Sequence, residues 1–166
     1  MADKTNILVG AGTLKVDDAD VGFTEDGVTV KYDRGYYDVE ADQSLGILEK
    51  KKIRQRCTVV TNLLEATLEN LKIVWDVENA VGSEGGKKTL SFGGDSAVTE
   101  HTLEFNGIAP GSSNTRKFYV WKAVSIEAGE HAYKKGEKTV IPVTFEAIMD
   151  LTKPVKTQYG YFEDTV

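Results

Sequence analysis

The chain has 166 residues, a length that fits a single domain over residues 1–166 with a core of its own. Its net charge of −6 argues against a protein that grips nucleic acid or an anionic membrane surface, because phosphate binding needs an excess of Lys and Arg. The one cysteine, Cys57, excludes an internal disulfide and is typical of a reducing compartment such as a cytoplasm.

The charges are distributed in two adjoining blocks. Residues 1–47 contain ten acidic and four basic side chains, whereas residues 48–58 contain five basic side chains against Glu49 alone. An acidic segment therefore adjoins a basic one. Residues 33–53, which span this boundary, are predicted to form a long extended arm rather than a tight turn.

Three early segments alternate between apolar and polar residues, which predicts strands. In 28–33, Val28, Val30 and Tyr32 share one face. In 36–42, the face opposite Val39 carries a row of carboxylates at Asp38, Glu40 and Asp42. In 53–59, Cys57 lies on the more apolar face, where a buried and inert thiol is expected.

One helix is predicted, over about 62–77. Its apolar face has the 3.6-residue spacing of a helix and consists of Leu64, Leu68, Leu71 and Trp75. Asn62 followed by Glu65 three residues later resembles a capping box at its start. We expect the apolar face to pack on the sheets and the helix to close one end or edge of them.

The later part of the chain contains four more predicted strands, at Thr89–Phe92, Val98–Phe105, Lys117–Ile126 and Thr139–Met149. The last two are partly apolar on both faces and are expected to be central. The predicted fold is therefore mainly β: a β-sandwich or barrel of two packed antiparallel sheets, one flanking helix and the long arm at about 33–53.

The residues that catalysis would need do not gather in the sequence. Neither His101 nor His131 has a Cys, His or carboxylate at metal-ligand spacing, and both are interpreted as surface or strand histidines. The run 10–12, Gly-Ala-Gly, fails to complete a dinucleotide-binding pattern because Lys15 follows where a glycine is needed. We therefore expect that the chain is not an enzyme. The sequence assigns no catalytic residue, no cofactor and no metal site.

Several segments, in their order, resemble one known family. The chain is similar to the bacteriophage major tail tube proteins of long-tailed phages. The resemblance is carried by Gly12, Asp20–Thr24, Gly27–Val30 and Asp42-Gln43, by the predicted helix at Leu64–Leu71, and by the predicted strand at Ile141–Asp150. Contractile-tail and type VI secretion tube proteins are related to that family. The resemblance covers roughly residues 8–80 and 117–160, and 81–116 adds nothing to it.

This resemblance implies a structural function. Such proteins self-assemble into stacked, usually hexameric rings that form a hollow conduit for DNA ejection, in a virion tail assembled in the host cytoplasm. The implied partners are other copies of the chain and, in the complete tail, the tape measure protein, the tail terminator and the tail-tip proteins. DNA passes through the lumen without specific binding, and no membrane is involved.

The tail tube hypothesis assigns roles to particular residues. Residues 28–42, and as a second candidate 139–149, supply strands that line the lumen, with Asp38, Glu40 and Asp42 on or near its wall. The alternative that this carboxylate row faces outward to solvent stays open. The inter-subunit arm is assigned Gln43, Leu45, Ile47, Lys50, Lys51, Lys52, Arg54 and Arg56, whose bases would meet acids of a neighbouring copy.

A second hypothesis from a different class is a monomeric β-sandwich module that binds carbohydrate or protein. Such a module needs an exposed aromatic platform, which Trp121 with Tyr119, or Tyr36 with Tyr37, would supply.

Overall fold

The computed structural model describes residues 3–94, 97–111, 113–127 and 129–165, and within them the chain is mainly β, as predicted. A 3-10 helix at Lys4–Asn6 precedes β1 Thr13–Val16, β2 Ala19–Asp20, β3 Thr24–Val39 and β4 Glu49–Leu63. The helix α1 Leu68–Val74 and the small strands β5 Gly82–Glu84 and β6 Lys87–Thr89 follow. The chain then forms β7 His101–Ile108, β8 Thr115–Ser125, β9 Ile141–Ala147 and β10 Gly160–Asp164.

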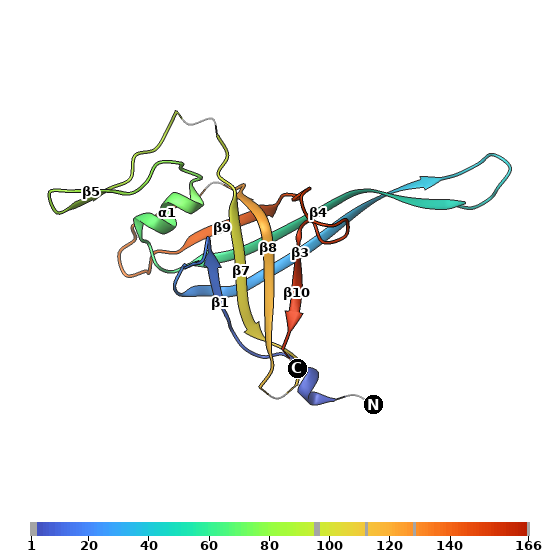
Figure 1. Ribbon diagram of the computed structural model, residues 1–166, viewed down its shortest axis with the longest axis horizontal. Helices are drawn as coiled ribbons and strands as arrows, with labels where there is room; N and C mark the ends of the chain where they lie inside the picture. The colour runs from blue at the N-terminus through green and yellow to red at the C-terminus, as the bar shows by residue number, and fades with distance from the viewer. Residues whose placement is uncertain (1–2, 95–96, 112, 128, 166) are drawn as a thin grey trace.

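One large antiparallel sheet in the order β2-β1-β7-β8-β9-β4-β3 forms the body. Along one edge, β8 has two successive partners: its first half pairs with β10 and its last residues, 123–125, pair with β9. This change of partner lets the sheet fold over on itself, so that β1, β7, β8 and β10 lie across β9, β4 and β3 (Figure 1). The two layers of the sandwich are therefore continuous through the β8–β9 junction.

The core lies between these two layers. Leu14 and Leu103 from one layer and Val59, Ile141 and Phe145 from the other are at most 1% exposed and belong to one apolar cluster. Their alternation along each strand follows from the two-residue period of a strand, which sends every second side chain inward. Burial of these apolar side chains away from water is the main interaction that stabilises the folded sandwich.

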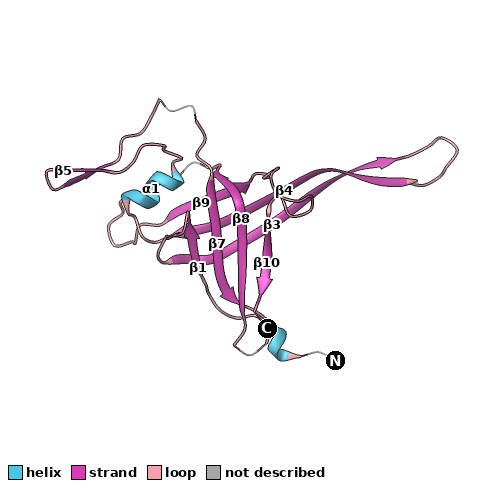
Figure 2. Cartoon of the chain, viewed as in Figure 1, coloured by secondary structure: helices cyan, strands magenta, loops and turns pink. Residues whose placement is uncertain are grey.

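The helix closes one end of the sandwich, as expected, but it is shorter than the predicted 62–77 (Figure 2). The predicted cap at Asn62 is wrong, because β4 continues to Leu63 and pairs with β3 on one side and β9 on the other. Thr67 is the N-cap, and its side chain accepts a hydrogen bond from the Asn70 backbone N–H at 3.1 Å. Because β4 is hydrogen-bonded on both sides, the chain up to Leu63 is a strand and not the start of the helix.

The predicted apolar face of the helix is confirmed only in part. Leu71 is buried, and Leu68 and Trp75 pack against the core while half-buried. Leu64 instead lies between β4 and the helix, and the buried Val74 was missed. The Val74 carbonyl also accepts a hydrogen bond from the Ser125 hydroxyl at 2.9 Å, which ties the helix to the end of β8.

The long arm predicted at about 33–53 is the outer part of the β3–β4 hairpin. Figure 1 shows this two-stranded ribbon projecting well beyond the sandwich. Pairing continues to Val39 opposite Glu49, with a register shift between Gly35 and Tyr36. Residues 40–48 form the loop at its end, which we call the tip.

Three later strands occur close to their predicted positions, but the strand predicted at Thr89–Phe92 is wrong. The chain there forms the β5–β6 hairpin, which turns at Gly85 and Gly86, and β6 ends at Thr89. Both glycines have positive φ, a conformation that a tight hairpin turn demands and that glycine adopts at low cost. The strand in this region therefore ends at Thr89, the residue at which the alternation predicted it to begin.

Replacing Phe145 by Ala should lower the free energy of unfolding by about 3–5 kcal/mol, because it opens a cavity between the two layers. Phe23→Ala is the matched control: its side chain is 76% exposed, so the change should stay within about 0.5 kcal/mol. Urea unfolding followed by circular dichroism measures both. Equal effects of the two substitutions would contradict the assigned core.

Candidate assembly surface

The three carboxylates assigned to the lumen do not form a row on one strand. Asp38 lies on β3, and its Oδ1 accepts a hydrogen bond from Lys50 Nζ at 2.6 Å. β3 ends at Val39, whose carbonyl accepts the Leu48 backbone N–H at 2.8 Å as the chain turns. Glu40 and Asp42 therefore belong to the tip, and the prediction of one strand face carrying all three is wrong.

The basic residues of the arm are partly paired within the chain itself. The hairpin register places Lys50 opposite Asp38, and Lys51 Nζ lies 3.8 Å from Glu49. Arg56 Nε donates to Glu146 of β9 at 2.8 Å. The two lysine pairs are exposed and contribute about 0–1 kcal/mol each, so these lysines remain available for exchange with other partners, whereas Arg56 and Glu146 are half-buried.

Lys52 and Arg54 differ from the other arm bases. Within the described part of the chain neither forms an ion pair, although the register places them beside Tyr36 and Gly35. These two are therefore the arm bases whose charge is still uncompensated.

The tip is apolar at its end and acidic around it. Leu45 is fully exposed, and Ile47 and Leu48 are exposed as well, beside the polar Gln43. All charges in 35–49 are acidic: Asp38, Glu40, Asp42 and Glu49. Apolar side chains displayed together so far from the core are typical of a contact with another molecule.

A groove of about 350 Å³ lies where the arm joins the body, between β10 and the β3–β4 hairpin. Its apolar lining includes Tyr32, Cys57, Phe118, Tyr159 and Phe162. The Tyr159 hydroxyl donates to the Gln55 carbonyl at 3.0 Å, which fixes this side of the groove to the stem of the arm. Burial raises the pKa of both the Tyr159 phenol and the Cys57 thiol, so both stay protonated near neutral pH.

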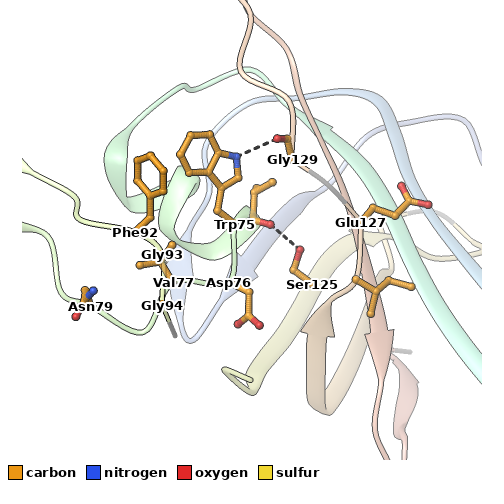
Figure 3. Close-up of a pocket in the computed structure, with 12 residues that line it drawn as sticks. Trp75, Asp76, Val77, Asn79, Phe92, Gly93, Gly94, Ser125, Glu127 and Gly129 are labelled. Atoms are coloured by element: carbon orange, nitrogen blue, oxygen red, sulfur yellow. Dashed lines mark hydrogen bonds between the residues drawn. The ribbon is translucent and has the colours of Figure 1, made fainter. Parts of the chain in front are cut away.

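A hollow of about 610 Å³ lies beside the helix (Figure 3). Trp75 Nε1 donates to the Gly129 carbonyl at 3.0 Å, and the Trp75 ring meets Phe92 edge to face. Asp76 accepts the Thr99 backbone N–H, and Glu127 accepts the Thr144 hydroxyl. The polar groups around this hollow thus hold the fold together rather than converge on a reacting position.

The two histidines have different neighbours. His101 is buried at the start of β7, with Nδ1 2.6 Å from Asp17 Oδ2, and the His131 ring packs edge to face on Tyr133. Among the described residues, no three or more His, Cys, Asp or Glu side chains gather as they would around a metal ion. No helix in the described ranges has the length and apolarity needed to cross a membrane.

The aromatic side chains considered for a binding module are only partly available. Tyr119, Trp121 and Tyr161 form a cluster with ring centroids 5.0–5.6 Å apart, all half-buried. Lys153 Nζ covers the Trp121 ring at 4.1 Å, and Trp121 Nε1 donates to the Thr157 carbonyl. Tyr36 and Tyr37 are exposed neighbours on one strand, so they point to opposite faces and form no joint platform.

The groove is the feature that the sequence analysis missed. Its residues come from β3, β4, β8, β10 and the segment before β10, and each looked like an ordinary strand or loop residue. The one local signal was Phe162, an apolar residue in the polar C-terminal segment, which is exposed in the structure.

Comparison with known proteins does not identify a family for this chain. No protein-family model matches the chain, and no curated protein matches it significantly.

The strand that forms one wall of the groove is held by Arg116 and Asp164. Arg116 Nε and Nη2 donate to the two Asp164 oxygens, each at 2.6 Å, and this hydrogen bonding lowers the pKa of Asp164. A lowered folded-state pKa adds stability above the unfolded value of about 3.9, and that stability is lost as pH falls through the folded value.

We expect Arg116→Gln to raise the pKa of Asp164 toward its ordinary value, measured by NMR titration of the carboxyl group. Lys135→Gln, which removes an exposed charge elsewhere, should leave that pKa unchanged. An Asp164 pKa that ignores the loss of Arg116 would show that the pairing does not form in solution.

Proposed function

We propose that the chain is the structural subunit of a phage tail tube, which self-assembles into stacked, hexameric rings around a conduit for DNA ejection. The observation that carries the proposal is the β3–β4 arm, a long ribbon that leaves the body and ends in exposed apolar side chains. A ribbon of two strands has little core of its own and is marginally stable in water. Contact with further copies would supply the missing support.

The outer edge of β3 also supports assembly. β3 is 16 residues long and is the last strand of the sheet order, so in the described structure no strand pairs with its other side. Such an edge offers a row of backbone N–H and C=O groups to another chain. Joining these edges around a ring satisfies them and leaves no open end.

The charge of the chain fits a conduit for DNA. The net charge is −6, and Asp38, Glu40 and Asp42 lie together near the end of the arm. Carboxylates on or near an inner wall would repel the phosphate backbone and let DNA pass without sticking. In the complete tail the proposal includes the tape measure, terminator and tail-tip proteins as neighbours.

The direct test is negative-stain electron microscopy of the purified chain, with sedimentation velocity over a range of concentrations. Rings or long hollow tubes are expected, because both the arm and the β3 edge are left unsatisfied in one copy. A strict monomer at high concentration would count against the proposal.

Shortening the arm provides a second test. Val39 pairs with Glu49, so replacing residues 40–48 by Asn-Gly leaves a two-residue hairpin of the favoured type. The circular dichroism spectrum and melting temperature should be preserved, while tubes and rings are lost. A control insertion of Gly-Ser between Gly85 and Gly86, in the separate β5–β6 hairpin, should leave assembly intact. Unchanged assembly after the shortening would remove the arm from the proposal.

A further inference from the structure

We propose that the groove between β10 and the stem of the arm is the receptor for the tip of a second copy, with Leu45, Ile47 and Leu48 entering its apolar lining. This assignment rests on the proposed function, in that it requires copies of the chain to associate. It adds the site on the body that the arm binds, and it places Glu40 and Asp42 in that contact between copies instead of on the lumen wall.

The tip combines exposed apolar side chains with acidic ones. Leu45 and Leu48 are exposed to solvent without any apolar neighbour from the core. Of the four carboxylates in 35–49, Asp38 and Glu49 have lysine partners within the hairpin, whereas Glu40 and Asp42 form no ion pair in the described structure. The tip therefore offers an apolar wedge with two uncompensated negative charges.

The groove complements this wedge in both polarity and charge. Its walls are mostly aromatic and aliphatic, including Tyr32, Phe118, Met149 and Phe162. Its lining contains two charged side chains, Lys52 and Lys156, and neither forms an ion pair within the described residues. None of the described residues that line the groove is a carboxylate, so two unpaired cations face the space that two unpaired anions would need.

The length of the arm keeps each tip away from the groove of its own chain. Tyr32 lines the groove and Val39 is the last strand residue before the tip, so about 23 Å of paired strand separates the two at the rise of an extended chain. The ribbon runs outward and away from the body over this length (Figure 1). A tip therefore cannot fold back into the groove of its own chain, and the occupant is a tip from another copy.

Photo-crosslinking locates the contact. Benzoylphenylalanine replaces Leu45 in an equal mixture of unlabelled and nitrogen-15-labelled chains, and mass spectrometry identifies crosslinked peptides that join one copy to another. We expect crosslinks to the groove, in 149–162 or at Phe118. The same group at Tyr133, an exposed aromatic position away from the tip, should give none there.

The crosslinking outcomes separate the two proposals. Assemblies whose Leu45 crosslinks fall outside the groove would overturn the receptor assignment and leave the tail tube proposal standing. A chain that stays monomeric, with no crosslinks between copies, would overturn both.

Charge reversal tests the pairing of the two surfaces. The double variants E40K/D42K and K52E/K156E should each weaken association at least tenfold, and the quadruple variant should recover most of that loss. The control E84K/K135E reverses two exposed charges elsewhere that form no ion pair with any described residue, and it should not change association. A quadruple variant no better than either double variant, with circular dichroism showing an intact fold, would overturn the assignment.

Discussion

The pairing of β3 with β4 is the constraint on which the rest of the structure depends. Its inner half is part of the sandwich, because Val59 and Leu63 enter the core and β4 pairs with β9. Its outer half continues the pairing past a register shift between Gly35 and Tyr36, and among the described residues it has neither a third strand nor a second layer. One continuous hairpin therefore belongs both to a self-sufficient body and to a segment that lacks burial of its own. The proposed assembly supplies that missing burial.

Much of the fold follows from local patterns in the sequence. The alternation at Val28–Asp33 and Ile53–Val59 predicted strands and the inward side of Cys57 and Val59, because a strand has only two faces. The same reasoning failed at Glu40 and Asp42, where a hydrogen-bonded turn ended the strand before the alternation did. It also failed at Asn62, because a local capping pattern does not show that this segment pairs with two other strands, β3 and β9.

The candidate site was predictable only on one of its two sides. The tip stood out in the sequence because apolar Leu45 and Ile47 occur within an acidic block that adjoins a basic one. The groove did not, because it forms where the two layers of the sandwich separate beside β10, and that separation depends on β8 exchanging one partner for another. Such a surface is a property of the topology rather than of any segment.

The register shift between Gly35 and Tyr36 has a consequence for how the arm can change over generations. Such an irregularity increases the twist of a ribbon, so it sets the direction in which everything beyond it points. Because side chains alternate with a period of two, a single inserted residue beyond that point would turn every outer side chain to the opposite face. Lengthening this ribbon while keeping every outer side chain on its present face therefore takes two added residues on each strand.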